Sequence, residues 1–556
     1  MTRNVYQQHI HHEIPRLLSF LDREPFSPAY GCFDRLHWAW SAIDIANADL
    51  QKFTLPLTYV YQLESPDNPY FHHPEVLTWI EAAIRFCCKE QSRHGAFNQW
   101  LPNDNSIVAA GFVMHDLIFV LQLLQKELSS DTIKLFTAAA IRAGRMLVNF
   151  EELHGFNSNH HLANAVALLD ISRWLDHPEA TPFKDRALQI IKKVLARQSK
   201  SGAFYEYAGA DPGYHTLGLA FLAACYEICP ETFIFNGVKS AVAFSSHFIS
   251  PVSGNGGAYG TRGTHLLYPS GFEIAAKYGI HPELPARIAT IVAEELCVTP
   301  SNTDLTNLIP LMSDYTRTCL MPPLTHPAPS TPLPTQDFFC DETTFFSFPR
   351  LHCRIHGRLN GGMLMIHSTL RQKVLFASAG YMVEYGKKKG FSGVFDGDWK
   401  RSENILHFKA KLQQTNRIRL TPFKLMVLRS YFFLFGNLMP LNLFMKKLMA
   451  WLLIFKKKFF NLPMQRTIVI QDHCVIITDC ITNHTAKTIT LHHCKQGYIH
   501  FMGSARYFDS SWLRFEPAPS VRERKNQGPE RTTTLDDPRV LAPGDQVEIS
   551  FAVDLE

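Results

Sequence analysis

The sequence predicts an α+β protein of several domains, in which an N-terminal (α/α) toroid of helix hairpins precedes a C-terminal antiparallel β-sandwich. The chain has 556 residues, which is too long for one ordinary domain. Apolar residues recur at helical spacing through 1–320 and alternate with polar ones at a spacing of two through 338–556. Six prolines in 321–337 separate the two patterns and predict a linker. Helical and β elements that are segregated in this way indicate separate layers.

Repeated turns predict how the helices of the first domain are arranged. The stretch "QSRHGAF" begins at Gln91, and a near copy, "QSKSGAF", begins at Gln198. Related Gly-aromatic turns occur at Gly155 and Gly257, which gives a repeat of roughly 50 to 60 residues, suited to a two-helix hairpin. Equivalent loops of a toroid emerge at the same end, so we expect the two copies to face one cleft. The alternative is chance recurrence of a common turn.

The second domain contains short runs of alternating residues that predict half-buried strands. Examples are "HCRIHGRL", "MLMIHSTL", "RTIVIQDHCVIITDCIT", "KTITLHHC" and "QVEISFAVDL". Antiparallel strands of this kind pack as a β-sandwich.

An apolar and basic segment, 421–465, interrupts the predicted sandwich as a helical insertion. Its longest uncharged run, Ser430 to Met445, has 16 residues, whereas a membrane-spanning helix needs about 20. Lysine pairs and triplets flank the apolar runs, so we expect 423–463 to bind an anionic membrane surface. A helical insertion packed on the toroid and a true span are the alternatives. Nucleic acid is not expected, because the aromatics lie in apolar runs without polar groove residues.

The charge distribution, the cysteines and the N-terminal sequence predict where in the cell the protein is located. The formal net charge is +5, but residues 404–471 contain twelve Lys or Arg and no Asp or Glu. Twelve scattered cysteines without a CxxC pair predict reduced thiols, no metal site and no cofactor. The N-terminus lacks the apolar core of a signal peptide. We therefore expect a cytoplasmic protein, peripheral to the inner face of the cell membrane.

Three polar stretches in the helical domain are candidates for a functional site. In "NSNHH" (157–161), one asparagine would suffice to cap the following helix. We therefore expect Asn159 and His160 to face a ligand, with capping as the alternative. Trp100, in a loop that capping largely explains, could stack on a sugar ring.

The other two stretches are aromatic or rich in glycine. In 205–215, Tyr214 falls in the first turn of a predicted helix, and Asp211 is at least as suited to capping as to catalysis. In 256–273, a cation beside flexible glycines suits carboxylate binding, although a lone Arg262 is often only a solvated charge. The further candidates for substrate binding in these stretches and beside Asn159 are Tyr207, His161, His215, His265 and Tyr268.

With these motifs, the chain resembles the heparinase II/III-like polysaccharide lyases and their alginate-lyase relatives. "NSNHH" (157–161) is similar to the family's Asn-His motif at a helix start, and "DPGYHTLGLAFL" (211–222) is similar to the segment that supplies its catalytic tyrosine. The resemblance implies a toroid followed by a β-sandwich, and β-elimination on an acidic poly- or oligosaccharide through removal of the C5 proton of a uronic acid.

The resemblance also implies roles for individual residues. Asn159 and His160 would engage the substrate carboxylate, and Tyr214 would serve as acid and also as base if Arg262 or His160 supplied a nearby cation. The family often adds a histidine from the β-domain. The candidates here are His352, His356 and His367, and spacing does not distinguish them.

The sequence is also compatible with other functions. A uronate C5-epimerase would share the proton abstraction. A glycoside hydrolase would need two carboxylates, for which Asp104 and Asp211 are the available pair and Glu206 is a third option. A non-catalytic glycan-binding protein on the membrane is the last alternative.

Overall fold

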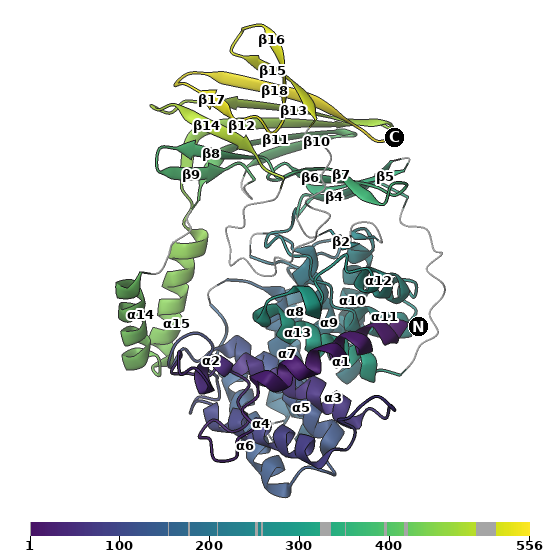
Figure 1. Cartoon of the computed structure of the whole chain (residues 1–556), viewed down its shortest axis with the longest axis vertical. Helices are drawn as coiled ribbons and strands as arrows, with labels where there is room; N and C mark the ends of the chain where they lie inside the picture. The colour runs from purple at the N-terminus through teal and green to yellow at the C-terminus, as the bar shows by residue number, and fades with distance from the viewer. Residues whose placement is uncertain are drawn as a thin grey trace.

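The structure, a computed structural model, places a helical body below two β-sheets (Figure 1). It describes residues 2–153, 155–175, 178, 180–207, 209–250, 254–256, 259–322, 335–350, 352–393, 397–415, 421–495 and 519–556.

The helical body alternates inner and outer helices. Helices α5, α7 and α9 pack side by side and are buried along most of their length. Helices α4, α6, α8 and α10 each bury only one apolar face. This alternation confirms the predicted (α/α) toroid. The helical elements are α1 (Thr2–Phe20), α2 (Arg35–Trp38), η1 (Ala48–Phe53), α3 (Thr54–Gln62), α4 (Pro74–Glu90), α5 (Ile107–Leu124), α6 (Ser130–Asn149), α7 (Ser158–Trp174), α8 (Ala180–Leu195), α9 (Pro212–Ile228), α10 (Thr232–Ser246), α11 (Ser270–Lys277), α12 (Leu284–Ala293), η3 (Pro300–Asn302) and α13 (Leu305–Leu320).

The repeated turns have equivalent structures. Gly95 and Gly202 both adopt positive φ, +88° and +93°. A β-carbon at Gly95 would lie 2.2 Å from the carbonyl oxygen of Arg142 on α6, and one at Gly202 would lie 1.9 Å from that of Ser240 on α10. Only glycine fits such an approach. The sequence repeat is therefore a structural repeat. Gly257, the start of the fourth turn, lies outside the described residues.

Two antiparallel sheets form the C-terminal half, as predicted. The smaller has the order β3-β4-β5-β6-β7, and the larger runs β16-β15-β18-β13-β12-β11-β9-β8-β14-β17, with β10 paired to β11. Phe346 and Ile355 of the small sheet share a core with Leu406 and Ile468 of the large one. The strands are β3 (Phe338–Cys340), β4 (Phe345–Arg350), β5 (Cys353–Arg358), β6 (Met363–Ser368), β7 (Lys373–Ser378), β8 (Tyr381–Tyr385), β9 (Lys388–Phe391), β10 (Asp398–Ser402), β11 (Ile405–Gln414), β12 (Phe459–Ile470), β13 (Cys474–Thr482), β14 (Ile489–His493), β15 (Ser520–Lys525), β16 (Glu530–Thr534), β17 (Arg539–Leu541) and β18 (Gln546–Asp554), with a separate pair β1 (Ile249–Ser250) and β2 (Gly254–Asn255) in the helical body.

The small sheet lies against one end of the toroid (Figure 1). Phe244, Phe248 and Tyr259 of the toroid form an apolar cluster with Phe345 on β4 and Met363 at the start of β6. This contact fixes which toroid loops face the β-domain. Most of the predicted linker, 323–334, lies outside the described residues.

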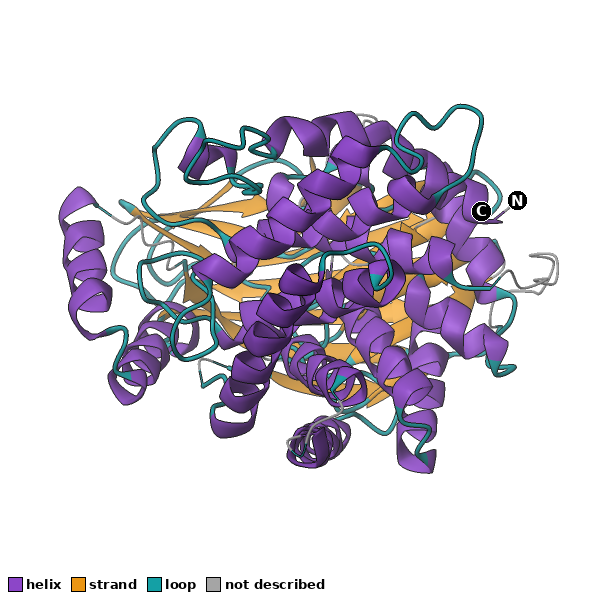
Figure 2. Cartoon of the chain, turned by 90° about the horizontal axis from the view of Figure 1, so that it is seen from below, coloured by secondary structure: helices purple, strands orange, loops and turns teal. Residues whose placement is uncertain are grey.

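The predicted insertion, 421–465, forms a helical hairpin between β11 and β12, and it ends at 458 because 459–465 belong to β12. It consists of α14 (Pro422–Phe435), α15 (Met439–Ala450) and a π-helical turn, η4 (Trp451–Phe455). Figure 2, which views the chain from below, shows the hairpin projecting at the left edge beside the toroid.

A buried ion pair holds the large sheet together and leads to a testable prediction. Arg466 on β12 contacts the Asp479 carboxylate on β13 at 2.6 and 2.7 Å, and both side chains are fully buried. Asp479→Ala leaves this guanidinium buried without its anion, so we expect the free energy of unfolding to fall by about 3–5 kcal/mol. Thermal and denaturant unfolding measure the change. Glu384→Ala, which removes the exposed pair with Lys389, should cost less than about 1 kcal/mol; equal effects would contradict the prediction.

Candidate functional site

The candidate residues lie at the end of the toroid that faces the small sheet. Because successive helices alternate in direction, the connections that lead from outer to inner helices emerge at one end. The α6–α7 connection carries Asn159 into the first turn of α7, the α8–α9 connection carries Tyr214 into the first turn of α9, and the α10–α11 connection carries Arg262. The structure therefore brings the three polar stretches together.

Asn159 is fixed by a carboxylate from the neighbouring connection. Its backbone N–H and its Nδ2 donate to Glu206 Oε1 and Oε2 at 3.1 and 2.8 Å, and both residues are fully buried. The two connections also pair as short strands, since Ser158 N–H donates to Tyr205 O and Tyr207 N–H donates to Phe156 O, both at 3.1 Å. Asn159 is therefore held by more than the capping of its own helix.

His160 is oriented by another carboxylate. Its Nδ1 lies 3.0 and 2.9 Å from the two oxygens of Glu152. A carboxylate on one ring nitrogen fixes the orientation of an imidazole. The contact therefore holds the His160 ring in one orientation beside Asn159.

Tyr214 and Arg262 are positioned together by Asp211. The Asp211 carboxylate caps α9 by accepting the N–H of Tyr214 at 3.0 Å, and it also accepts the N–H of Arg262 at 2.9 Å. The Arg262 guanidinium carbon then lies 3.6 Å from the centre of the Tyr214 ring. Tyr214 keeps 9 % of its surface exposed. A cation at this distance stabilises negative charge that develops on the phenol.

Arg262 remains cationic although it is buried. Burial opposes its charge, but the neighbouring Tyr214, Tyr207, Glu206 and Asp211 raise the pKa of the guanidinium above its usual value. The Tyr207 ring centre lies 5.6 Å from it. Arg262 thus links the two tyrosines to the acidic groups of the site.

Glu206 titrates near neutral pH. Burial raises the pKa of its carboxyl from 4.5 to about 7, against the opposing effect of the Asn159 hydrogen bond and the charge of Arg262. Because the raised pKa favours the protonated form in the folded chain, Glu206 contributes stability that is fully present below pH 4.5 and lost as the pH rises through about 7.

Glu206→Gln should remove this pH dependence while preserving an acceptor for Asn159. The difference in unfolding free energy between variant and wild type should shift in favour of the variant by up to about 3 kcal/mol between pH 4.5 and 8. Thermal unfolding midpoints across this range measure it. Glu75→Gln, on the exposed start of α4, is the control. Parallel curves for wild type and Glu206→Gln would show that Glu206 does not titrate as described.

Two of the three candidate β-domain histidines face the toroid. His356 on β5 and His367 on β6 are buried, with ring centres 5.7 Å apart, and His356 lies 6.4 Å from the ring of Tyr259. Within the described part of the chain, neither imidazole has a hydrogen-bond partner. His352 instead lies exposed in the turn between β4 and β5.

The same interface is rich in buried cations. Burial lowers the pKa of Arg354 to about 10 and that of Arg358 to about 9. The negative charge of Asp211 raises the pKa of Arg358 and so opposes the effect of burial. Arg358 on β5 therefore interacts electrostatically with Asp211, which positions Tyr214. Such a concentration of cationic side chains suits an acidic ligand.

Not every predicted residue faces this site. His215 is fully buried, its Nδ1 accepts the N–H of Phe204 at 3.1 Å, and its Nε2 lies 2.9 Å from Ala241 O. Both ring nitrogens are thus used within the fold, contrary to the prediction of substrate binding. His161 packs its ring 4.6 Å from that of Phe156, and burial lowers its pKa to about 4.

The remaining residues predicted to bind substrate differ in how far they are exposed to solvent. Tyr268 is fully buried, and His265 is nearly so and interacts electrostatically with His367. Tyr207 is also buried and adopts a positive φ of +59°. Trp100 is 61 % exposed, in a loop that contacts the insertion.

The two aspartates proposed for a hydrolase both serve the backbone. Asp211 caps α9 as described, and Asp104 accepts the N–H groups of Gln99 and Trp100 at 3.1 and 3.0 Å. The backbone N–H groups thus occupy both carboxylates. Asp211 is a helix cap, as considered from the sequence, whereas Asp104 fixes the loop before α5, whose N-cap is Ser106.

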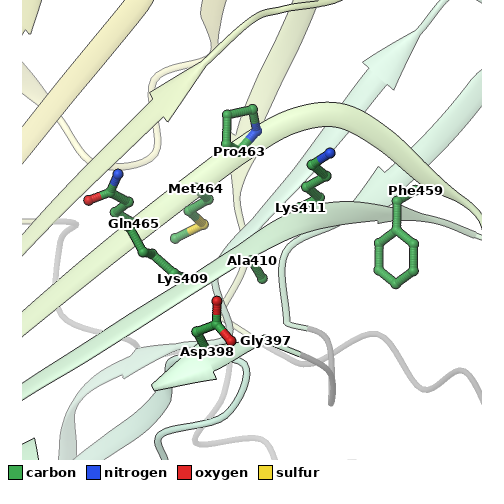
Figure 3. A pocket seen from close by; sticks show the side chains of 9 residues that line it. All are labelled: Gly397, Asp398, Lys409, Ala410, Lys411, Phe459, Pro463, Met464 and Gln465. Carbon is green, nitrogen blue, oxygen red and sulfur yellow. The ribbon is translucent and has the colours of Figure 1, made fainter. Parts of the chain in front are cut away.

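A hollow on the β-domain is separate from this site. It is lined by residues of the β10–β12 region, and none of its lining residues comes from the toroid (Figure 3). Lys409, Lys411 and Phe459 lie along it, next to the ends of the insertion.

Comparison with known proteins identifies the fold. No family model matches the sequence, and no curated protein matches it either. Among solved structures, a chondroitin AC lyase of Streptomyces coelicolor A3 matches with a TM-score of 0.52 and 10 % identity, covering 100 % of this chain and 76 % of that one. The chain shares the polysaccharide-lyase fold. Heparinase III matches with a TM-score of 0.49 and 9 % identity over 91 % of this chain and 75 % of that one. A heparan sulfate lyase of Pedobacter heparinus matches with a TM-score of 0.44 and 10 % identity, covering 100 % of this chain and 83 % of that one.

The polysaccharide-lyase fold agrees with the resemblance drawn from "NSNHH" and "DPGYHTLGLAFL". At such low identity the likeness concerns the fold. The chemistry therefore depends on the side chains of this chain.

Proposed function

We propose that this protein is a polysaccharide lyase that cleaves a uronate-containing glycan by C5 proton abstraction and β-elimination. The observation that carries the proposal is the Arg262 guanidinium carbon 3.6 Å from the centre of the Tyr214 ring. The α6–α7 connection, which carries Asn159 and His160, is joined to the same site through Glu206, which accepts from Asn159 Nδ2 and whose carbonyl oxygen accepts from Thr261 Oγ1. The shared fold supports the proposal. The interface cations Arg354 and Arg358 suit an acidic polymer.

The reaction assigns a role to each group. Ionised Tyr214 takes the C5 proton, and the electron pair moves into the C4–C5 bond as the C4–O bond breaks. The phenol then returns the proton to the leaving sugar oxygen. Arg262 stabilises the phenolate before proton transfer. His160 and Asn159 offset the charge that develops on the C5 carboxylate.

Glu206 sets the geometry of Asn159. An amide nitrogen carries two hydrogens, so one can bind Glu206 while the other donates to the substrate. Because Asn159 has no exposed surface, the neighbouring connections must shift when a substrate binds.

The direct test is incubation of the purified chain with chondroitin, heparan sulfate and alginate while ultraviolet absorbance of an unsaturated uronate is recorded. The proposal predicts that absorbance rises with at least one polymer. New reducing ends without absorbance would indicate hydrolysis, and solvent deuterium at C5 of an intact polymer would indicate epimerisation. Binding of a glycan without any of these changes would indicate a non-catalytic protein. Each of these three results contradicts the proposal.

A further inference from the structure

The insertion, defined here as residues 421–458, exposes a large apolar surface. Phe432 is the buried residue of α14, whereas Phe433 at 68 % and Phe444 on α15 at 60 % are mostly exposed. Exposed apolar side chains that gather on one segment mark an interaction site on a folded protein. The other large apolar side chains exposed on the insertion are Phe423, Leu425, Met426, Val427, Leu434, Phe435, Leu438, Leu441, Leu448, Trp451, Leu452, Leu453 and Phe455.

The same segment is basic and contains no acidic residue. Lys424 and Lys447 are exposed beside the apolar side chains, and a run of three lysines, 456–458, follows η4. Glu403 and Asp472 are the nearest acidic residues along the chain. The surface therefore combines apolar and cationic groups.

The hairpin is held in place by the toroid. Asn442 Nδ2 on α15 donates to Asn103 O and Asp104 O, both at 3.0 Å. His94 contacts Asn437 O at 2.9 Å, and Arg429 on α14 forms an ion pair with Asp44. The helices are thus positioned by specific contacts, and their apolar side chains face outward from a fixed base.

The helices are too short to cross a bilayer. Helix α14 has 14 residues and α15 has 12, whereas a span needs about 20. In the part of the chain that the structure describes, α5 is the helix long and apolar enough for a span, and 78 % of it is buried in the toroid. An in-plane position at the bilayer surface fits helices of this length.

We propose that the insertion docks this protein onto an anionic lipid bilayer, with its apolar side chains in the headgroup region and its lysines on the anionic headgroups. Charge decides between this occupant and a second copy of the chain. Two copies joined face to face would oppose like charges without acidic partners, whereas an anionic leaflet complements them. The cytoplasmic leaflet supplies such a surface.

Two exposed tryptophans of the toroid lie within four residues of side chains or carbonyl groups that contact the insertion. Trp100 belongs to the loop that holds Asn442, and Trp40, 69 % exposed, lies four residues before Asp44. Tryptophan favours the membrane–water interface. Both add to the surface that would meet the bilayer.

Co-sedimentation with vesicles tests the proposal. The full chain should sediment with vesicles of phosphatidylcholine and phosphatidylglycerol, and salt should weaken the binding because it screens the headgroup charge. Vesicles of pure phosphatidylcholine should bind the chain less.

The double variant Phe433→Ser with Phe444→Ser should bind the vesicles at least about tenfold more weakly, since replacing each exposed ring removes apolar area that would enter the bilayer. Lys424→Glu with Lys447→Glu should weaken binding to the anionic vesicles alone.

The matched control replaces two exposed apolar residues of the β-domain, Leu370→Ser with Val540→Ser, and should bind as wild type does. Unchanged circular dichroism shows that each variant is folded. No binding to any vesicle, or full binding by Phe433→Ser with Phe444→Ser, would overturn the proposal. A dimer in light scattering that this variant dissociates would instead assign the surface to a second copy.

Discussion

Tyr214→Phe should lower the rate of uronate elimination by about 10²–10⁴-fold. The substitution removes the oxygen that takes the C5 proton and returns it to the leaving group. It keeps the ring on which Arg262 packs, so the fold and the affinity for the polymer should change little. Initial rates of absorbance increase at saturating substrate measure the effect.

A second tyrosine on α9 provides the control for this variant. Tyr226 contacts the rings of Phe235 and Tyr278 near the far end of the same helix. Tyr226→Phe should retain the wild-type rate. If Tyr214→Phe kept more than about half of the activity, another residue would be the acid and base.

Arg262→Met should reduce the rate by about 10²–10³-fold. Methionine preserves an apolar contact with the Tyr214 ring, but the cation that stabilises the phenolate is lost. Arg262→Lys should recover part of the activity because it restores the charge without the planar group.

The control for this second prediction is another cation–π contact of the toroid. Arg197 lies 4.1 Å from the centre of the Phe156 ring and is exposed. Arg197→Met should leave the rate unchanged. Equal losses in Arg197→Met and Arg262→Met would indicate a general structural effect. A fully active Arg262→Met would show that the cation is not needed.

Patterns that depend on local spacing were sufficient to predict the fold. The Gly-Ala-Phe repeat predicted equivalent turns, and Gly95 and Gly202 do approach equivalent helices, because positive φ and a close backbone contact both require glycine. The change from helical spacing to alternation predicted the two halves of the chain. These signals survive in one sequence because each depends on nearby residues.

The candidate site was predictable only in part. Asn159, Tyr214 and Arg262 could be chosen because their residue types exceed what turns and caps require. Their partners could not be chosen, since Glu206 lies 47 residues from Asn159 in the sequence and no local pattern links them.

Histidine and glutamate were the residues most difficult to interpret from sequence. His215 stands next to Tyr214, but adjacent residues of a helix point in different directions, and its ring satisfies backbone groups instead. Glu152 had no signal in the sequence, since no local pattern links it to His160, eight residues later. Only the packing of the α6–α7 connection brings it to His160.

The most direct measurement is a crystal structure of Tyr214→Phe with a bound uronate oligosaccharide. The proposed mechanism predicts that the uronate carboxylate lies against Asn159 and His160. It also predicts that C5 lies within about 3–3.5 Å of the position that the Tyr214 hydroxyl occupies in the wild type. An oligosaccharide bound at another surface, or one whose C5 faces away from Tyr214, would contradict it.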